Sequence, residues 1–235
     1  MKKERTGMLS EASAQPEVNP YSRWVYDHPA HLLPEPTPAL LASARASATV
    51  APKRTIVELG SGSGNFLLQL GQIWPEDQLI GFEIRFKRLV KTARKLEKAG
   101  LNHVWLLRER AERFASYFAP GSVDRVYLNF PDPWRKPGQW KKRLVREPFL
   151  AQLETTLSPG GTFRLKTDHS GYFLHCISQF NRRSGWNFSG FSNHLHRSVS
   201  VEPYPKTEFE LLFSSKRKAI YALTAKWNGH TRQTG

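Results

Sequence analysis

The sequence predicts a single α/β domain with a mostly parallel twisted sheet and helices on both of its faces. Two observations support this fold class. From Thr55 onwards, short apolar runs alternate with segments of helical spacing, and such alternation produces a largely parallel sheet covered on both faces. The length of 235 residues fits one domain of this kind, and a hydrophobic content of 39% supplies one buried core.

The predicted elements follow one another in regular order. We expect strands at 56–59, 79–83, 104–107, 123–128, 162–167 and 220–225, each a short apolar run. We expect helices at 66–73, 85–98, 147–157 and 172–182, where apolar residues recur every three or four positions. Gly100 and the turn at 159–161 supply stop signals. The Ala-rich segment 39–48, behind Pro38, is compatible with a further short helix.

The ends of the chain differ in composition from its middle. Residues 1–20 mix charged and small polar residues without an apolar core, which excludes a signal peptide and predicts a mobile N-terminal tail. We expect one domain over 21–228 and a C-terminal tail over 229–235.

Cys176 is the only cysteine, so no intrachain disulfide is expected and a reducing, cytoplasmic compartment fits. Its apolar neighbours predict a packed core thiol.

The charge balance points to a polyanionic partner. The net charge is +15, from 35 Lys and Arg against 20 Asp and Glu, and a field of that sign concentrates polyanions. Nucleic acid is therefore the leading partner, and an anionic membrane is disfavoured because no apolar run approaches the ~20 residues of a spanning helix. His194 and His196 stand two apart with no third ligand nearby, so no metal site is predicted.

A glycine-rich turn follows the first strand of the alternating region. It contains Gly60, Gly62 and Gly64, and Glu58 precedes it. Glycines allow a tight turn and a close approach of a ligand to the backbone. The dinucleotide fingerprint requires a glycine at position 65 or 67, where this chain has Asn65 and Leu67. This disfavours a nicotinamide oxidoreductase. An acid beside the turn favours S-adenosylmethionine, because a carboxylate attracts its sulfonium cation.

A second acid, Glu83, ends the next predicted strand about twenty residues further on. A carboxylate at that place can accept hydrogen bonds from both ribose hydroxyls of an adenosine-type ligand. Ligands of such sheets bind at the carboxyl ends of the strands. Glu58, the glycine turn and Glu83 therefore predict a cofactor site at that edge.

The strand at 123–128 leads into Asp132, which stands between two prolines that fix its backbone and aim its carboxylate. The chain then turns basic, with Trp134 and Trp140 interleaved. The basic residues are Arg135, Lys136, Lys141, Lys142, Arg143 and Arg146. Basic side chains contact phosphates and aromatic rings stack on bases, so this segment is predicted to contact nucleic acid. We expect residues 135, 136 and 141–143 to contact its phosphates.

The sequence Phe130-Pro131-Asp132-Pro133-Trp134, followed by Lys136 and Lys142-Arg143, resembles the signature of the tRNA guanine-N7 methyltransferase family. Three further matches occur in the same order. They are Glu58-Leu59-Gly60-Ser61-Gly62, Thr167-Asp168 and Thr207-Glu208-Phe209-Glu210. Together the matches cover roughly residues 55–225.

The resemblance implies a Rossmann-like class I methyltransferase that forms N7-methylguanosine in tRNA, at a guanine of the variable loop, with S-adenosylmethionine as methyl donor. Asp132 would be the catalytic carboxylate and would also lie against the cofactor. The other cofactor-binding residues would be Glu58, Gly60, Gly62, Gly64, Glu83 and Arg110. The substrate-binding residues would be Lys136, Asp168, Thr207, Glu208, Phe209 and Glu210.

The chain departs from the family pattern at a few positions. Arg110 stands where relatives usually carry Asp or Asn near the adenine. Gly138 and Gln139 stand where relatives often have Arg and His, and His169 replaces a frequent Trp. The central acids are all retained.

Two other functions remain open at this point. A methyltransferase acting on an exocyclic amine, adenine N6 or cytosine N4, also carries an Asn/Asp-Pro-Pro-aromatic tetrad, but here one proline follows Asp132 instead of two. A non-catalytic RNA-binding module is disfavoured by the retention of Glu58, Glu83 and Asp132. The oligomeric state is not predicted.

Overall fold

The computed structural model describes residues 19–27, 31–33, 35–39, 41–42, 51–195 and 205–229. The expected tails, 1–20 and 229–235, lie almost entirely outside the described residues, as does most of the Ala-rich segment 39–48. Within the described ranges, no helix is long and apolar enough to cross a membrane.

The described residues form an eight-stranded sheet with the order β1-β4-β3-β2-β5-β6-β8-β7. The strands are β1 (Leu32–Leu33), β2 (Thr55–Leu59), β3 (Gln78–Phe82), β4 (Val104–Leu107), β5 (Val123–Asn129), β6 (Leu157–Thr167), β7 (Trp186–Ser192) and β8 (Tyr221–Trp227). Neighbours from β1 to β6 are parallel, whereas β8 is antiparallel to both β6 and β7. The predicted mostly parallel sheet is confirmed.

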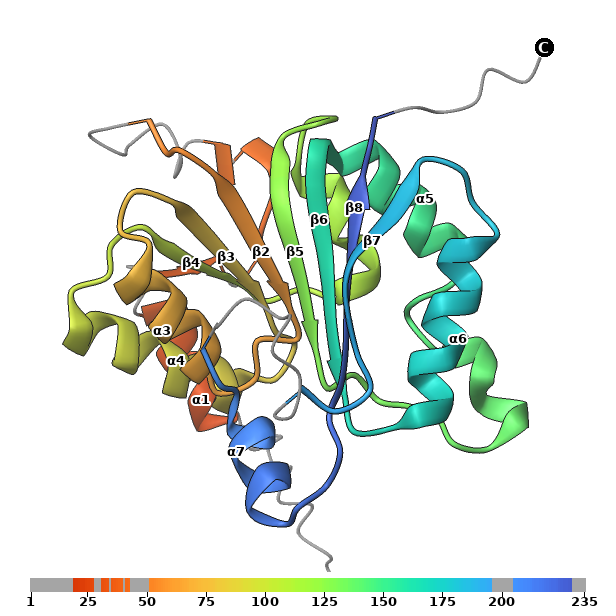
Figure 1. Ribbon diagram of the computed structural model, residues 1–235. Helices are drawn as coiled ribbons and strands as arrows, with labels where there is room; N and C mark the ends of the chain where they lie inside the picture. The colour runs from red at the N-terminus through yellow and green to blue at the C-terminus, as the bar shows by residue number, and fades with distance from the viewer. Residues whose placement is uncertain are drawn as a thin grey trace, which may run out of the picture.

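Helices cover both faces of this sheet, as predicted (Figure 1). They are α1 (Pro20–Asp27), α3 (Asn65–Ile73), α4 (Phe86–Ala99), α5 (Glu147–Thr156), α6 (Ser170–Asn181) and α7 (Glu208–Ser215), with the short 3-10 helices η2 (Ala111–Tyr117) and η3 (Pro137–Lys142). Successive strand residues point to opposite faces. Ile56 of β2 therefore packs in the cluster that contains α3 and α4, and Val57 packs in the cluster that contains α5 and α6.

Helix α4 illustrates how local sequence sets these elements. Its buried residues recur at helical spacing and include Leu89, Ala93 and Leu96. Gly100 follows in the left-handed region, with φ 66°, and its N–H donates to the Glu97 carbonyl. A glycine adopts this conformation without a Cβ clash, so the helix ends where the sequence predicts.

Cys176 of α6 is fully buried, which confirms the expected core thiol.

Several elements were not predicted from the sequence. Helix α1 lies in a proline-containing region, and its aromatic residues pack under basic side chains of α4: the Arg94 guanidinium lies 5.1 Å from the Trp24 ring centroid. Strands β1 and β7 and helix α7 were also missed. Strand β6 begins earlier than expected, because Leu157 pairs with Val123 before a register shift at the Pro159–Gly161 turn.

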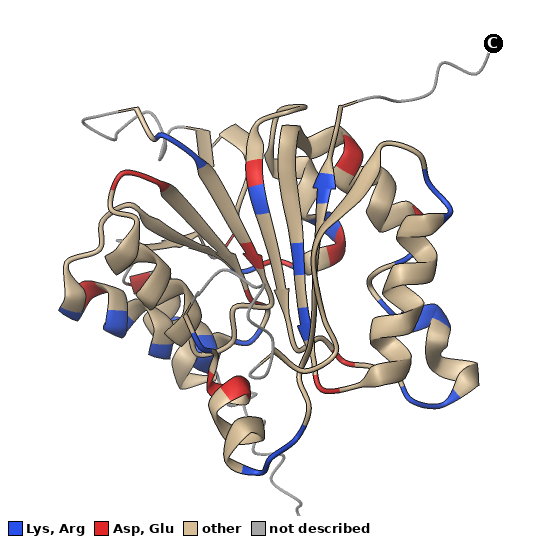
Figure 2. Cartoon of the chain, in the orientation of Figure 1, with Lys and Arg blue, Asp and Glu red and all other residues tan. Residues whose placement is uncertain are grey.

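The carboxyl ends of the parallel strands meet at one edge of the sheet, which is the lower edge in Figure 1. Helix α7 crosses below that edge, although it comes from a distant part of the sequence. Lys and Arg positions lie along α4 and along the same edge (Figure 2). This edge therefore combines strand ends, a covering helix and positive charge.

Candidate active site

The turn between β2 and α3 is built on glycines in the left-handed region. Gly60, Gly62 and Gly64 have φ of 74°, 59° and 76°, which residues with a side chain rarely adopt. Gly64 has a second reason to be glycine, because a Cβ there would lie 2.1 Å from Thr92 Cγ2 of α4. A Cβ on Gly60 would meet nothing within 4 Å. The turn thus packs tightly against α4 on one side and is open on the other.

Glu83 joins this turn to the start of α4. Its side chain is 6% exposed. Its Oε2 accepts a hydrogen bond from the Gly62 N–H at 3.1 Å, and its Oε1 accepts one from the Arg85 N–H at 2.9 Å. Arg88 Nη1 lies 3.6 Å from Oε2. Each carboxylate oxygen has two lone pairs, so Glu83 holds the turn and keeps acceptor capacity for a ligand.

Glu58 lies near the end of β2 and is more deeply buried, at 2% exposure. Its Oε1 accepts a hydrogen bond from Asn129 Nδ2 at 3.0 Å, and its Oε2 has no hydrogen-bond partner within the described part of the chain. Burial raises the pKa of the Glu58 carboxyl to about 8, although the Asn129 bond and the Lys166 charge oppose the shift. The buried, unpartnered oxygen marks a place for a ligand atom.

Asn129 itself was not predicted as a site residue. It is the last residue of β5 and lines the same cavity as Glu58. A polar residue at the end of a central parallel strand, directly before the Phe130–Trp134 motif, was the available signal.

Helix α7 is fastened to the sheet by a buried ion pair. Lys166 Nζ of β6 lies 2.5 Å from Glu210 Oε2, with side-chain exposures of 2% and 3%. Burial lowers the pKa of Lys166 to about 8, against the raising effect of Glu210. Thr207 Oγ1 also accepts from the Glu210 N–H at 3.0 Å, in a capping box. Thr207 and Glu210, predicted to bind substrate, fix the start of α7 in this structure.

The two residues between them face the site. Glu208 accepts hydrogen bonds from Ser63 Oγ and, at 2.6 Å, from Asn65 Nδ2, so it bridges α7 to the glycine turn. Phe209 is exposed, and its ring centroid lies 6.0 Å from that of Phe130. The segment 207–210 is thus anchored by its two buried residues, Thr207 and Glu210, and its first three residues line the cavities.

The motif after β5 has an unusual backbone. Phe130 and Trp134 have φ of 50° and 46°, a left-handed conformation that is costly for residues with a side chain. The Phe130 N–H donates to the Lys166 carbonyl at 2.8 Å, which helps to hold the bend. Asp132 lies exposed between these two residues. The backbone therefore presents its carboxylate outward from the sheet edge.

One predicted phosphate contact is corrected by the structure. Arg143 was expected to face RNA with its basic neighbours, but it is 3% exposed. Its Nε donates to the Pro133 carbonyl at 3.0 Å, and its guanidinium lies 4.8 Å from the Trp140 ring centroid. Arg143 therefore stabilises the loop from its buried side. The predicted phosphate contacts are left to its exposed basic neighbours.

Two adjoining cavities lie at this edge. The glycine-turn cavity, of about 350 Å³, is lined by Glu58, residues 60–66, Asn129 and residues 207–209, among others. The Glu83 cavity, of about 360 Å³, is lined by Glu83, Arg110, Asp132 and Trp134, among others. The residues that line both are Gly60, Arg88, Asn129, Phe130 and Phe209. The structure thus brings together every predicted cofactor residue and, from the predicted substrate set, Thr207, Glu208 and Phe209.

The remaining predicted substrate residues lie outside these two linings. Lys136 is exposed at the start of η3. Asp168 lies just beyond β6, with Oδ2 3.7 Å from Lys218 Nζ. Glu210 is buried in its ion pair.

Within the described ranges, no group of three His, Cys, Asp or Glu side chains is arranged to hold a metal ion.

Comparison with known proteins places this site in a family. Residues 52–223 match the family model described as "Putative methyltransferase". The chain is 37% identical over 160 residues to a bifunctional glycosyltransferase/methyltransferase of Fusobacterium nucleatum, covering 68% of this chain and 25% of that protein. It is 35% identical over 174 residues to the tRNA (guanine-N(7)-)-methyltransferase of Limosilactobacillus fermentum, covering 74% of this chain and 80% of that protein.

The fold agrees with solved structures. A structure titled "Structure of an antibiotic related Methyltransferase" aligns with a TM-score of 0.59 at 15% identity, covering 84% of this chain and 98% of that chain. This likeness confirms the predicted Rossmann-like class I methyltransferase fold. From the family model and the identity over most of the Limosilactobacillus enzyme, the chain belongs to the tRNA (guanine-N(7)-)-methyltransferase family.

Proposed function

We propose that this protein transfers a methyl group from S-adenosylmethionine to N7 of a guanosine in tRNA, at the variable loop that the family resemblance implies. The observation that carries the proposal is the convergence of Glu58, the glycine turn, Glu83 and Asp132 on two adjoining cavities in a chain of this family. A tRNA substrate also favours a cytoplasmic location.

The cavity residues fit S-adenosylmethionine. The buried Glu58 Oε2, which has no hydrogen-bond partner among the described residues, offers an acceptor at the glycine turn. A bound sulfonium would favour the ionised form of this carboxyl. The Glu83 carboxylate lines the neighbouring cavity and offers acceptors to ribose hydroxyls. Arg110 lines that second cavity too, where an acidic or amide residue was usual, and its guanidinium can face the adenine ring.

The reaction requires orientation and charge stabilisation more than a strong base. Bound S-adenosylmethionine supplies an electrophilic methyl group. Guanine N7 carries a lone pair in the neutral base, so no proton has to be removed before attack. Asp132 can accept hydrogen bonds from the N–H groups of guanine and stabilise the positive charge that develops on the purine. The left-handed residues Phe130 and Trp134 hold Asp132 in place for this role.

The product of the reaction tests the proposal directly. Incubation with tRNA and methyl-labelled S-adenosylmethionine, followed by nucleoside analysis, is expected to yield labelled N7-methylguanosine. Labelled N6-methyladenosine or N4-methylcytidine would instead assign the protein to the exocyclic-amine enzymes. Binding of tRNA without any cofactor affinity in calorimetry would assign it to RNA-binding modules.

Asp132→Asn tests the catalytic assignment. We expect turnover to fall at least ~100-fold, in the range for loss of one preorganised electrostatic group, with a much smaller change in cofactor affinity. Single-turnover methylation and calorimetry measure the two quantities. The matched control is Asp27→Asn, the same change at an exposed position on α1. Near-normal turnover of the Asp132 variant would remove Asp132 from the mechanism.

A further inference from the structure

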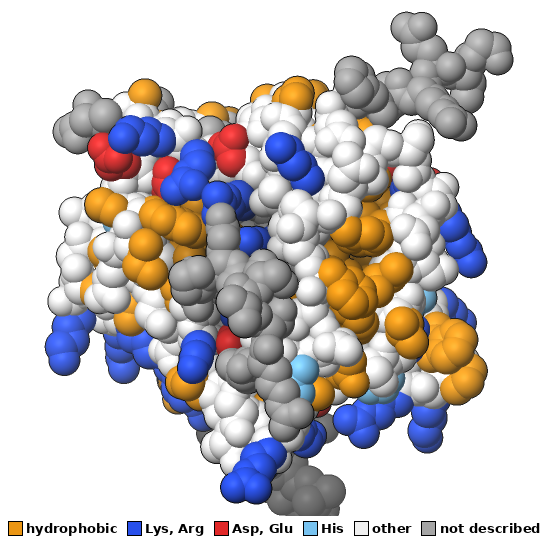
Figure 3. All heavy atoms as spheres, in the orientation of Figure 1, with side chains coloured by type: hydrophobic (Ala, Val, Ile, Leu, Met, Phe, Trp, Pro, Cys, Tyr) orange, Lys and Arg blue, Asp and Glu red, His pale blue; other side chains and the backbone are white. Residues whose placement is uncertain are grey.

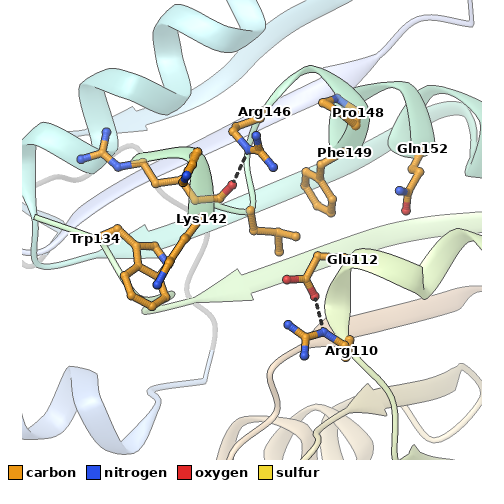
Figure 4. A pocket seen from close by; sticks show the side chains of 11 residues that line it. Arg110, Glu112, Trp134, Lys142, Arg146, Pro148, Phe149 and Gln152 are labelled. Atoms are coloured by element: carbon orange, nitrogen blue, oxygen red, sulfur yellow. Dashed lines mark hydrogen bonds and ion pairs between the residues drawn. The ribbon is translucent and has the colours of Figure 1, made fainter. Parts of the chain in front are cut away.

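A third cavity lies beside the candidate active site, between η2, η3 and the start of α5. We call it the basic cavity; its volume is about 530 Å³, larger than either cavity of the candidate site. Figure 4 shows Arg110 and Glu112 on one side of it and Trp134, Lys142 and Arg146 on the other. Trp134, Lys142 and Arg110 also line the Glu83 cavity, so the two spaces adjoin.

The charge of this cavity suits a phosphate. Its basic lining residues are Arg110, Lys141, Lys142, Arg143 and Arg146, against the acid Glu112. Arg143 is held by the Pro133 carbonyl, and Arg146 Nε donates to the Arg143 carbonyl at 2.9 Å. Lys141 and Lys142 are exposed at the end of η3. A positive cavity at an RNA-facing edge attracts a backbone phosphate, because such contacts come mainly from Lys and Arg.

The same cavity also offers features that suit a base. The Trp134 ring lies on its wall, with Lys142 Nζ 4.8 Å from the ring centroid. Gln152 of α5 lines the cavity too, and its Oε1 is buried without a hydrogen-bond partner among the described residues. An aromatic face stacks on a base of any identity, and an amide oxygen accepts from an exocyclic amine.

We propose that the basic cavity binds the nucleotide that neighbours the methylated guanosine in the RNA strand. Its phosphate lies against Lys141, Lys142 and Arg146, and its base stacks on Trp134 with Gln152 Oε1 accepting from a base amine. Splaying of unpaired nucleotides is the usual way in which proteins recognise RNA loops. The inference rests on the proposed function, because Trp134 places this nucleotide next to the target guanosine.

The test uses the full chain and tRNA transcripts in which one base is removed, immediately 5′ or 3′ of the target guanosine. We expect one of the two abasic transcripts to bind the wild type roughly 5- to 150-fold more weakly than intact tRNA, the range for loss of one base–aromatic stack. Trp134→Ala should lose most of this penalty, because the stacking face is gone and only the Gln152 contact to the base remains. Trp134→Phe and Trp140→Ala should retain the penalty, because Phe keeps a stacking face and Trp140 is outside the lining of the basic cavity.

A cooperative urea unfolding transition confirms that each variant is folded, and nucleoside analysis of the same wild-type reactions reports the product. Equal wild-type affinities for intact and both abasic transcripts overturn the cavity assignment without any variant. A full abasic penalty in Trp134→Ala also overturns it. If N7-methylguanosine is absent while the Trp134-dependent penalty persists, the proposed function fails and the nucleotide subsite stands.

Discussion

Three carboxylates of the site have three different environments. Glu58 is buried with one oxygen unpartnered among the described residues, Glu83 is buried with backbone N–H donors on both oxygens, and Asp132 is exposed. Surroundings determine what a carboxylate can do. Glu83 is therefore suited to hold neutral hydroxyls, Glu58 to face a cation, and Asp132 to meet a substrate that arrives from solvent.

Glu83→Ala is expected to weaken S-adenosylmethionine binding by ~1–3 kcal/mol, because two ribose hydroxyls lose a charged acceptor. The Gly62 N–H loses its acceptor in the same variant, so the turn also loses a constraint. Calorimetry measures the change, with Glu76→Ala as control at an exposed ion pair. Unchanged affinity would place the ribose elsewhere.

The environment of Glu58 is expected to appear in the pH dependence of stability. Its pKa is raised from 4.5 to about 8 in the folded protein, so between these values the folded chain keeps a proton that the unfolded chain has lost. The contribution of this group to the free energy of unfolding therefore falls as pH rises from 4.5 to 8. We expect Glu58→Gln to gain stability relative to the wild type across that window, because an amide has no charge to bury.

Urea unfolding at several pH values within the window measures this trend, and Glu76→Gln supplies the same chemical change at an exposed position. Measurements stay below pH 8, because the lowered pKa of Lys166 gives an opposite trend between about 8 and 10.5. A stability difference between Glu58→Gln and the wild type that does not vary with pH would contradict the raised pKa.

At the scale of elements, helix α7 shows how a segment from late in the chain completes a site made by earlier strands. The Lys166–Glu210 pair and the capping box hold its first turn against β6. Glu208 then reaches the glycine turn, and Phe209 lines both cavities. Loss of the anchor should therefore change both stability and ligand binding.

Glu210→Gln is expected to lower the free energy of unfolding by about 3–5 kcal/mol, because it leaves the Lys166 ammonium buried without its anionic partner. Replacing both residues by Leu should recover much of that loss, since an apolar pair can replace a buried ion pair. Urea unfolding of Lys166→Leu, Glu210→Leu and the double variant gives the coupling energy. Glu76→Gln, in an exposed pair with Lys53, should cost less than ~1 kcal/mol. A similar small cost at Glu210 would mean that the pair does not anchor α7.

The strongly patterned elements were predictable from the sequence. Strands β2 and β3 and helix α4 were placed to within a residue or two, because buried runs and an amphipathic stripe with a terminal glycine are local signals. The site acids Glu58 and Glu83 follow from those strand ends.

The missed features depend on contacts distant in sequence. Helix α7 has exposed Leu211 and Leu212, so its anchor is an ion pair with β6 instead of an apolar stripe. Strand β7 is a sheet edge, with mostly exposed residues and a register shift near Gly190. The burial of Arg143 depends on the Pro133 carbonyl and on Tyr172 of α6. None of these partners can be identified from spacing alone.

At the scale of the whole molecule, the +15 charge is unevenly placed. Basic side chains project along the lower edge, where the strands end (Figure 3). The segment after β5 contributes Arg135, Lys136, Lys141 and Lys142 as exposed members, while Arg143 is turned inward. The exposed members are the ones expected to neutralise RNA phosphates.

The salt dependence of tRNA binding tests this surface. Lys141→Ala with Lys142→Ala should flatten the slope of log affinity against log salt by roughly 1–2 units, because fewer counterions are released. The control Arg182→Ala with Lys226→Ala removes the same charge at exposed residues near the opposite strand ends, and should leave the slope almost unchanged. Lys136→Ala should reduce turnover more than it changes the slope, given its place in the family motif. Equal, small changes of the slope in all three variants would mean that these basic residues only keep the protein soluble and do not contact phosphate.

The position of β8 has a consequence for the order in which the sheet can form during synthesis. In the described sheet, β7 pairs with β8 alone, and β8 is made some thirty residues after β7. A nascent chain that has passed Ser192 but has not reached Tyr221 therefore has no strand partner for β7. Phe188 and Phe191, which are exposed even in the complete sheet, then stand on an unpaired strand. An unpaired apolar strand is prone to pair with other chains, so we expect β7 to be open to such pairing during this interval of translation.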